Sequence, residues 1–510
     1  MGSLAGMLKE RGYRVSGSDD SVYPPMSDML AEWEIEVRQG YRPENTAGAD
    51  LVVIGNAVSR GNAEVEHVLE RRMPYCSMAE ALRDFFLRGK EVIAVAGTHG
   101  KTTTTALLAH ILVEAGLEPS FFVGGVPCNY GSNFRLGEGG HFVIEGDEYD
   151  SAFFEKIPKF AVYRPHRLVL TSLEFDHADI YRDLNEIALW FRRLVNVVPS
   201  NGNVIYSSGY PALEEAVRHS LAPRNSFGGP GADFYCEEMG VDGEWSNLLL
   251  NVPGGEGVRL RTRIFGGFNR ANIAAAAAMA LRLGVSPEAL GRGVESFMGV
   301  RRRQELIYSR KGFRVYEDFA HHPTAIAGMI AAVRERFPSS RLWAVYEPRS
   351  ATSRRRVFQE ELPGAFAGAD RVLIKTPYKI DAIPEKDRID MDLVVGGINL
   401  RGGSARLFGD TRMIVQALFD GLDRSEDNVV IIMSNGGFDG IYDLVRRGAD
   451  ALYSMDAARE SGRRTAQCDH CETARSRLLT CCSAESAATH PSAAASTTCR
   501  TFLQVTSPMA

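Results

Sequence analysis

Short apolar runs alternate with helical stretches along most of the chain. The apolar runs end at glycine or polar residues, and the segments that follow carry apolar residues at a helical period. Strands and helices that alternate in this way predict parallel, Rossmann-like sheets and therefore an α/β protein. The expected strands are Tyr13–Ser18, Leu51–Gly55, Val92–Ala96, His141–Glu145, Arg167–Ser172, Arg314–Tyr316, Arg341–Tyr346, Arg371–Lys375 and Asn428–Met433.

The same pattern divides the chain into domains. A length of 510 residues predicts about three folded units. An alanine-rich helix, Asn272–Leu283, closes the middle one, and the strand–helix alternation then restarts. From about Asp456 the sequence turns to Ser, Ala, Thr, Arg and Cys without a hydrophobic period, which predicts a disordered tail. The expected segments are 1–88, 89–300 and 301–455, followed by the tail 456–510.

The first domain begins in an unexpected way. Met1–Lys9 already has the pattern of the helix that normally follows the first strand and glycine-rich turn of a nucleotide-binding sheet. We therefore expect that strand to be missing, either because the start is assigned too late or because the domain is truncated. A late start is the favoured explanation, because loss of a central strand would expose the sheet and its apolar helix faces.

Composition and charge exclude several classes of function. The apolar runs are too short to cross a membrane. The 58 basic and 64 acidic residues give a formal net charge of −6, which leaves no basic excess for a general nucleic-acid binder. Only three of the eight cysteines precede Asp456, and the first residues lack a secretion signal. These features predict a reducing compartment, the cytoplasm.

The strongest chemical motif lies between the predicted strand Val92–Ala96 and a helix. Glycine turns at a helix N-terminus bind phosphate through backbone N–H groups, lysine adds a positive charge, and a threonine hydroxyl can bind Mg²⁺. The motif is a variant of the usual phosphate-binding loop, whose first glycine would fall at Val95; the alternative is an ordinary glycine-rich turn. It consists of Gly97, Thr98, His99, Gly100, Lys101, Thr102 and Thr103.

Two acidic clusters follow the next strands of the same predicted sheet. Residues 145–150 contain Glu145, and residues 174–179 contain His177. The carboxyl ends of parallel strands meet at one edge, so these groups should lie beside the phosphate loop and hold Mg²⁺ there. A solvated acidic loop or a capping cluster is the alternative for each segment taken alone.

Other candidate residues stand at domain boundaries and after later strands. Asn269 and Asn272 could cap the alanine-rich helix or bind adenine or ribose. Arg303, in the run 301–303, could belong to a charged hinge surface or reach the phosphates. The motifs Asp318–Thr324 and Glu347–Arg354 place a histidine pair and two arginines after strands. These groups are either structural or complete an active site at a domain interface.

These motifs together resemble the Mur ligase family, the ATP-dependent amide-forming enzymes of cell-wall precursor assembly, over nearly all of residues 1–455. The resemblance implies a three-domain architecture: an N-terminal Rossmann-like UDP-sugar domain, a central P-loop ATPase and a C-terminal Rossmann-like domain that receives the amine. Segments 145–154, 173–181, 347–350 and 433–438 are most similar to the members that join UDP-N-acetylmuramate to the tripeptide L-alanyl-γ-D-glutamyl-meso-diaminopimelate.

The resemblance also implies roles for single residues, with ATP and Mg²⁺ as cofactors. Lys101 would stabilise charge at the β- and γ-phosphates, while Thr102, Glu145 and His177 would hold Mg²⁺. The nucleotide would contact the loop Gly97–Thr103 and also Asn269, Asn272, Arg303 and Asp318. His321, Arg349 and the loop Ser434–Phe438 would face the acyl phosphate and the incoming peptide.

Three other functions remain open from the sequence. The first is a UDP-N-acetylmuramate–L-alanine ligase, and the second is a non-catalytic sensor that binds UDP-sugar or ATP. The third is another P-loop amide ligase, such as a folate-polyglutamylating enzyme. The N-terminal strands and the sequence Asp176-His-Ala-Asp179 argue against this third function.

Overall fold

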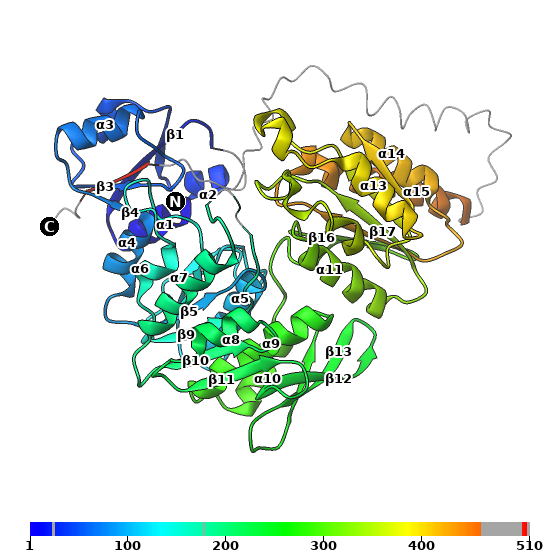
Figure 1. Cartoon of the computed structure of the whole chain (residues 1–510), viewed down its shortest axis with the longest axis horizontal. Helices are drawn as coiled ribbons and strands as arrows, with labels where there is room; N and C mark the ends of the chain where they lie inside the picture. The colour runs from blue at the N-terminus through cyan, green and yellow to red at the C-terminus, as the bar shows by residue number, and fades with distance from the viewer. Residues whose placement is uncertain (23–25, 177, 179, 461–501, 507–510) are drawn as a thin grey trace. The chain divides into compact units, whose positions relative to one another are not determined.

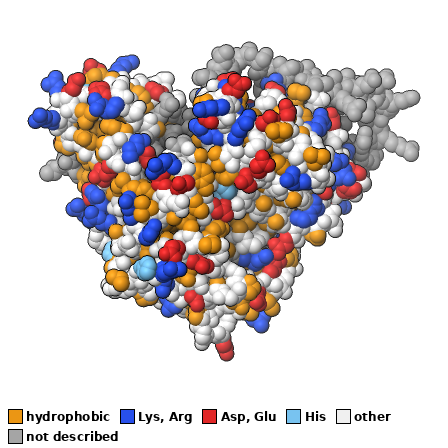
Figure 2. All heavy atoms as spheres, in the orientation of Figure 1, with side chains coloured by type: hydrophobic (Ala, Val, Ile, Leu, Met, Phe, Trp, Pro, Cys, Tyr) orange, Lys and Arg blue, Asp and Glu red, His pale blue; other side chains and the backbone are white. Residues whose placement is uncertain are grey.

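The computed structural model describes residues 1–22, 26–176, 178, 180–460 and 502–506, and these form two units (Figure 1). The first unit comprises Met1–Gln304 together with Phe502–Thr506, and the second comprises Glu305–Glu460. No helix in this described part of the chain is long and apolar enough to cross a membrane. On the face drawn in Figure 2, basic and acidic side chains are interspersed.

A five-stranded sheet begins the first unit. Its central strand, β21, comes from the far end of the chain and runs antiparallel to its neighbours β1 and β3 (Figure 1). The outer pairs β1–β2 and β3–β4 are parallel. The order across the sheet is β2 (Glu36–Gln39), β1 (Arg14–Asp19), β21 (Phe502–Thr506), β3 (Leu51–Ile54) and β4 (Tyr75–Ser77). In the sequence, α1 (Gly2–Glu10) precedes β1, α2 (Met26–Glu32) and α3 (Ala63–Glu70) lie between strands, and α4 (Met78–Leu82) follows β4.

Strand β21 lies between β1 and β3 and corrects one expectation. The prediction of a disordered tail is wrong for Phe502–Thr506, which forms a strand whose first four residues are buried. The folded pattern also continues beyond the predicted limit at 455, because helix α15 (Ile441–Glu460) ends later. Residues 461–501 and 507–510 lie outside the described residues.

A ten-stranded sheet forms the centre of the first unit and positions the phosphate loop. Strand β5 is parallel to both of its neighbours, β8 and β9, so the carboxyl ends of all three meet at one edge. Helix α5 (Lys101–Glu114) follows β5 after a short glycine turn. The order is β14 (Val258–Thr262), β13 (Trp245–Asn251), β12 (Phe234–Asp242), β11 (Arg224–Gly228), β10 (Asn203–Ser207), β9 (Arg167–Leu170), β5 (Glu91–Ala96), β8 (His141–Gly146), β6 (Ser120–Phe122) and β7 (Phe134–Arg135).

Helices cover this sheet, and the alanine-rich one is buried over most of its length. Helix α9 (Gly267–Arg282) packs against α5 and the strands β10–β12. Ala274–Ala278 are completely buried, because side chains this small let the helix backbone approach its neighbours closely. The other helices are α6 (Lys159–Tyr163), α7 (Leu184–Asn196), α8 (Pro211–Val217) and α10 (Pro287–Ser296). The core thereby holds the start of α9 beside the phosphate loop.

The second unit contains a six-stranded sheet. Its strands are parallel except for the edge strand β15, which forms an antiparallel hairpin with β16. The order is β15 (Glu305–Arg310), β16 (Phe313–Asp318), β20 (Asn428–Met433), β17 (Arg341–Tyr346), β18 (Arg371–Lys375) and β19 (Ala405–Phe408). Helices α11 (Pro323–Arg336), α12 (Leu362–Ala365), α13 (Met391–Leu400), α14 (Thr411–Gly421) and α15 connect or follow them. The largely parallel, Rossmann-like sheet predicted for this region is confirmed.

Candidate functional site

The phosphate loop has a backbone that only glycine tolerates at two positions. Gly97 has φ +136° and Gly100 has φ +81°, and Gly100 is the N-cap of helix α5. A Cβ atom at Gly97 would lie 2.2 Å from Thr171 Oγ1, and one at Gly100 would lie 2.4 Å from Asn272 Oδ1. The loop is therefore held against strand β9 and helix α9 at distances that exclude any side chain.

Substitution of Gly97 by alanine is expected to damage this loop. The left-handed backbone adds strain, and the Cβ clash involves the backbone nitrogen of Ser172 at 2.7 Å as well as the Thr171 hydroxyl. We expect a loss of about 1–3 kcal/mol of stability, measured by thermal unfolding, together with weaker ATP binding. Gly116→Ala is the matched control, because φ is +76° there but open space surrounds the Cβ position. Equal effects of the two substitutions would contradict the close packing of the loop.

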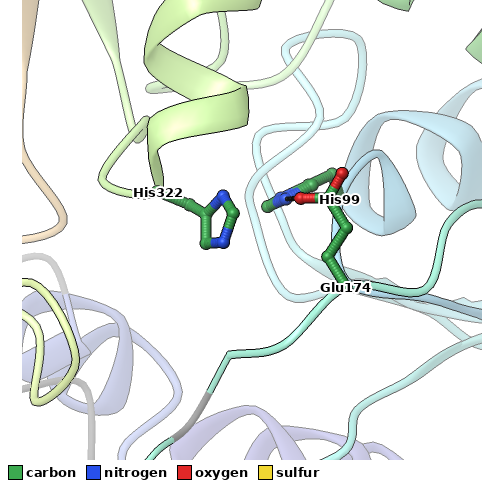
Figure 3. A group of neighbouring side chains, drawn as sticks. All are labelled: His99, Glu174 and His322. Carbon is green, nitrogen blue, oxygen red and sulfur yellow. Dashed lines mark hydrogen bonds and ion pairs between the residues drawn. The ribbon is translucent and has the colours of Figure 1, made fainter. Parts of the chain in front are cut away.

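Two residues of the loop, Thr98 and His99, bind the segment after β9. The backbone nitrogen of His99 donates to Ser172 Oγ at 2.7 Å, and the backbone nitrogen of Glu174 donates to Thr98 Oγ1 at 2.9 Å. His99 Nε2 lies 3.2 Å from Glu174 Oε2 (Figure 3). Figure 3 also draws His322, which belongs to the second unit. These contacts hold the loop in the shape that exposes its helix N-terminus to a phosphate.

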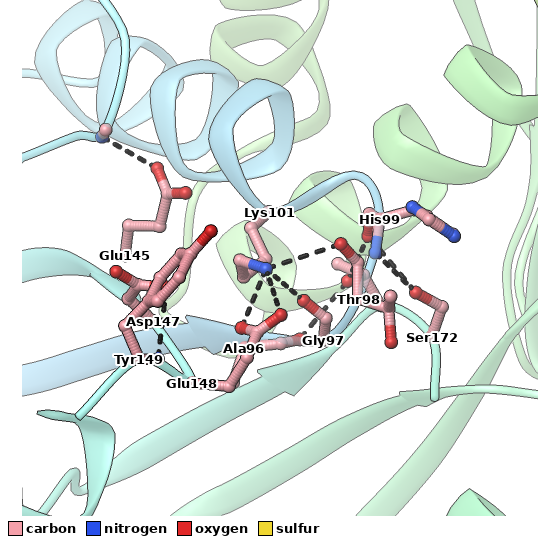
Figure 4. A network of polar contacts seen from close by, with 12 residues as sticks. Ala96, Gly97, Thr98, His99, Lys101, Glu145, Asp147, Glu148, Tyr149 and Ser172 are labelled. Carbon is pink, nitrogen blue, oxygen red and sulfur yellow. Dashed lines mark hydrogen bonds and ion pairs between the residues drawn. The ribbon is translucent and has the colours of Figure 1, made fainter. Parts of the chain in front are cut away.

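Lys101 lies at the centre of a buried network of opposite charges (Figure 4). Its ammonium group contacts Glu148 Oε2 at 2.8 Å and donates to the backbone oxygen of Gly97. Burial by itself lowers the pKa of Lys101, but the carboxylates of Glu148, Asp147 and Glu145 outweigh it and the pKa is raised. The lysine therefore carries its full positive charge at neutral pH, beside the place where phosphate oxygens would lie.

Thr102 and Glu145 form a second polar group on the same edge. Thr102 Oγ1 donates to Glu145 Oε1 at 3.0 Å, the Gly124 N–H donates to Glu145 Oε2 at 2.7 Å, and Arg303 Nη2 donates to Thr102 Oγ1 at 3.3 Å. Burial raises the pKa of Glu145, against the lowering effects of Lys101, the Gly124 N–H and Arg303. A buried carboxylate whose ionised form is disfavoured is suited to receive a cation, and its oxygen atoms suit Mg²⁺.

Asn269 and Asn272 do not cap the alanine-rich helix, because its N-cap is Gly266, which makes no side-chain capping bond. The two side chains instead form a buried chain of hydrogen bonds. Thr104 Oγ1, from helix α5, donates to Asn272 Oδ1 at 3.2 Å, and Asn272 Nδ2 donates to Asn269 Oδ1 at 3.2 Å. The asparagines therefore connect the start of α9 to the phosphate-loop helix.

Two predicted site residues of the first unit remain, Thr103 and His177, and the structure describes only the first of them. Thr103 lies buried in the first turn of α5. His177 lies outside the described residues, so its role as a metal ligand stays a prediction. Glu148 and Glu174 have no role predicted from the sequence, although each lies in one of the two acidic clusters. The signal that could have identified them is their position after strands β8 and β9.

In the second unit, Asp318 and His321 follow strand β16. Asp318 is the last residue of that strand, and its carboxylate accepts a hydrogen bond from the Ala320 N–H at 2.8 Å. His321 is half-buried, and its Nδ1 lies 2.9 Å from the backbone oxygen of Phe319. Its neighbour His322 accepts from the Thr324 N–H at 3.2 Å and so caps helix α11. The histidine pair therefore divides into one capping residue and one partly exposed residue.

Arg349 belongs to a buried cluster of charges in the same unit. Its guanidinium lies 3.4 Å from Glu347 Oε1 and stacks 3.9 Å above the ring of Tyr378. Glu347 is completely buried, accepts from Ser434 Oγ at 2.7 Å and lies 3.6 Å from Lys375 Nζ. These residues follow or end the parallel strands β17, β18 and β20. Lys375 was not predicted as a site residue, and the signal that could have identified it is its place at the end of a predicted strand.

Profiles of known families cover most of the chain. The Mur ligase middle domain matches residues 95–280, the Mur ligase family catalytic domain matches residues 1–90, and the Mur ligase glutamate ligase domain matches residues 302–436. The UDP-N-acetylmuramate–L-alanyl-γ-D-glutamyl-meso-2,6-diaminoheptandioate ligase of Escherichia coli is 39% identical over 451 residues, which are 88% of this chain and 95% of that protein. The chain belongs to the Mur ligase family.

The chain is also similar to a Mur ligase of another name and to a solved structure of the family. The UDP-N-acetylmuramate–L-alanine ligase of Chlorobium phaeobacteroides is 30% identical and covers 86% of this chain and 92% of its own length. A solved murein peptide ligase from Psychrobacter arcticus is 33% identical, with a TM-score of 0.65, and covers 88% of this chain and 96% of its own. As a Mur ligase, the chain is an ATP-dependent enzyme that forms an amide bond. The family and three-domain fold expected from the sequence are confirmed.

Proposed function

We propose that this Mur ligase joins UDP-N-acetylmuramate to the tripeptide L-alanyl-γ-D-glutamyl-meso-diaminopimelate. The observation that carries the proposal is the 39% identity with the Escherichia coli ligase of that name, which extends over 95% of the relative. A second relative with the same name, from Haemophilus influenzae, is 35% identical over 447 residues. The sequence of residues 145–154 and 347–350, which resembles the same group of ligases, supports this assignment.

The proposed reaction has two steps. An oxygen of the muramyl carboxylate bonds to the γ-phosphorus of ATP, and the bond to ADP breaks, which yields an acyl phosphate. The α-amino nitrogen of the tripeptide then bonds to the acyl carbon and loses a proton, while phosphate leaves. Both steps build negative charge on phosphoryl or acyl oxygens, so fixed positive groups at that place provide the main stabilisation.

The first unit supplies the groups proposed for nucleotide activation. Lys101 is charged and held by Glu148, so it can turn to the β- and γ-phosphates without gaining or losing a proton. Thr102 and Glu145 would hold Mg²⁺, together with His177, and the ion would neutralise charge on the phosphates. Asn272 adjoins Gly100, which supports placing this amide, and Asn269 beside it, near the nucleotide.

The second unit supplies the groups proposed for the incoming peptide. The acyl phosphate and the peptide would face Arg349, His321 and the loop Ser434–Phe438. The ribose would face Asp318. The buried cluster of Arg349, Glu347 and Lys375 supports this assignment, because ligands of open α/β sheets bind at the carboxyl ends of the strands. A fixed guanidinium there is suited to a carboxylate of the peptide.

Phosphate release in the presence of ATP, Mg²⁺ and UDP-N-acetylmuramate tests the proposal. The amine is offered in three arms: tripeptide, free L-alanine or none. We expect release of phosphate with the tripeptide, more than about tenfold above L-alanine, and mass spectrometry should show one amide product per phosphate. Release with L-alanine only would assign the L-alanine ligase instead, and no release in any arm would favour a non-catalytic sensor.

The proposed compartment is the cytoplasm. Cys76 and Cys236 are free thiols in the described part of the chain, as expected for a protein that works in a reducing environment.

A further inference from the structure

A buried histidine lies in the helix that follows the phosphate loop. His110 is 3% exposed and stands about two and a half turns after Lys101 in α5. Its Nδ1 lies 2.8 Å from Tyr130 Oη, and its Nε2 lies 2.9 Å from Ser296 Oγ. Burial lowers the pKa of His110, and the carboxylate of Glu114 offsets this effect only in part, so the ring is neutral at neutral pH. A neutral imidazole has one N–H donor and one acceptor, and both have a partner here.

The direction of these hydrogen bonds follows from Ser296. Its hydroxyl donates its single hydrogen to the backbone oxygen of Arg292 at 2.8 Å, so the hydroxyl oxygen accepts from His110 Nε2. His110 Nδ1 is then the acceptor and receives the hydrogen of the Tyr130 hydroxyl, whose pKa burial raises to about 12. The imidazole therefore carries its proton on Nε2. The three bonds form a continuous chain from Tyr130 to the end of α10, the His110 chain.

One end of the His110 chain lies on residues 123–131, the glycine segment, which contains Tyr130. The Gly124 N–H of this segment donates to Glu145 Oε2 at 2.7 Å. A Cβ atom at the next residue, Gly125, would lie 3.0 Å from Thr102 Cγ2, so the backbone passes directly over that side chain. The glycine segment thus contacts both described residues that are proposed to hold Mg²⁺.

The other end of the His110 chain lies on residues 296–303, the arginine segment. Backbone hydrogen bonds of 3.0 Å pair this segment with the glycine segment. The Asn129 side chain adds a further link, because its Nδ2 donates to the backbone oxygen of Ser296 at 2.9 Å. At the far end of the arginine segment, Arg303 Nη2 donates to Thr102 Oγ1 at 3.3 Å. The paired segments therefore reach the phosphate loop from two directions, and His110 fastens them to α5.

We propose that His110 is a positioning residue of the ATP site, which holds the paired segments so that Gly124 stays on Glu145 and Arg303 stays on Thr102. The inference rests on the proposed roles of Thr102 and Glu145 at the nucleotide. The ring bonds to both segments at once, so its loss would release them together. Small displacements of groups that orient a substrate cost large factors in rate, even when the altered residue does not touch the substrate.

The first test separates positioning from stability by kinetics. His110→Phe keeps an aromatic ring but removes both hydrogen bonds, and we expect kcat to fall and the KM for Mg·ATP to rise by about tenfold each, with an unchanged KM for the amine. The half-buried Tyr130 hydroxyl loses its acceptor, so the unfolding temperature of the first unit should fall by about 2–4 °C. His219→Phe, at an exposed histidine of the same unit, is the control and should change none of these values.

The double variant His110→Phe/Tyr130→Phe decides between the two roles. It removes the unpaired hydroxyl and should recover the unfolding temperature. The kinetic defect should remain, because apolar contacts between two rings do not fix the direction in which the glycine segment runs. Recovery of both the temperature and the Mg·ATP kinetics would assign a purely structural role to His110 and overturn the proposal.

The proton position of the ring is tested by NMR of protein labelled with ¹⁵N in its histidines. The signals that disappear in His110→Phe belong to this ring. We expect Nε2 to be protonated and Nδ1 to be unprotonated at neutral pH, because only this tautomer satisfies both partners. The opposite tautomer or a charged ring would break the His110 chain and overturn the proposal.

Hydrogen exchange measured by mass spectrometry tests the positioning without nucleotide, metal or turnover. In the double variant, backbone amides of the glycine and arginine segments should exchange about tenfold faster than in the wild type, whereas those of strand β9 should not change. Equal exchange in the two proteins would overturn the proposal. If phosphate release fails with every amine while this exchange result holds, the proposed function is wrong and the positioning by His110 stands.

Discussion

Replacement of Lys101 by alanine is expected to abolish ATP-dependent ligation, with a loss of about 10²–10³-fold or more in kcat. The ammonium group lies at the N-terminus of α5, on the edge of the sheet where phosphates bind, and its raised pKa keeps it charged at every pH at which the enzyme would work. The charge that develops on the transferred phosphoryl group would lose its nearest fixed cation. Phosphate release with tripeptide as the amine measures the effect.

The same substitution also breaks a buried ion pair, so folding must be measured separately. Loss of Lys101 leaves Glu148, which is 3% exposed, without its cation, at a cost of roughly 3–5 kcal/mol. The double variant Lys101→Ala/Glu148→Gln removes the uncompensated charge and should regain part of this stability without regaining activity. Lys386→Ala, at an exposed lysine of the second unit, is the control for both measurements. Turnover by a stably folded Lys101 variant would remove the phosphate loop from the mechanism.

Replacement of Glu145 by glutamine is expected to lower the activity without lowering the stability of the fold. Glutamine keeps the shape of the side chain and an oxygen for the Gly124 N–H, but it lacks the charge proposed to hold Mg²⁺. We expect about a 10²-fold loss of activity at limiting Mg²⁺, with partial recovery when the Mg²⁺ concentration is raised. Calorimetric titration with Mg·ATP should show weaker binding. Glu138→Gln, at an exposed position of the same unit, is the control.

The unfolding temperature of the nucleotide-free Glu145→Gln protein should be equal to or above that of the wild type at pH 7. Burial raises the pKa of Glu145 above the usual 4.5, so the folded protein binds that proton more tightly than the unfolded chain does. The free energy of unfolding therefore falls as the pH rises from about 4.5 through the raised pKa. The substitution removes this loss of unfolding free energy. The difference in unfolding temperature between the variant and the wild type should therefore become smaller as the pH is lowered. A variant that melts well below the wild type at pH 7 would contradict the assigned cause of the shift.

Local sequence patterns predicted the elements that carry the site. Apolar runs that end in glycine or acidic residues located β5, β8 and β9, and the phosphate loop followed from the spacing of Gly100, Lys101 and Thr102. These features could be read because a buried parallel strand and a phosphate-binding turn each constrain neighbouring residues. The alternation of strands and helices predicted the α/β class for the same reason.

Pairings between distant residues could not be predicted in this way. The contact of Lys101 with Glu148 and that of Thr104 with Asn272 each depend on which strands and helices become neighbours. Of the two alternatives for Asn269 and Asn272, helix capping is excluded, because the helix begins before them and their amides join a buried chain instead.

The sequence by itself determined the family, the phosphate loop and the acidic groups that follow the neighbouring strands, because each is written in residues close together in the chain. Only the tertiary structure decided how the first sheet is completed. In the sequence, only its apolar residues distinguish Phe502–Thr506 from the largely polar residues around it. Its place between β1 and β3 is set by two hydrophobic cores and the backbone groups of both strands, which exist only in the folded chain.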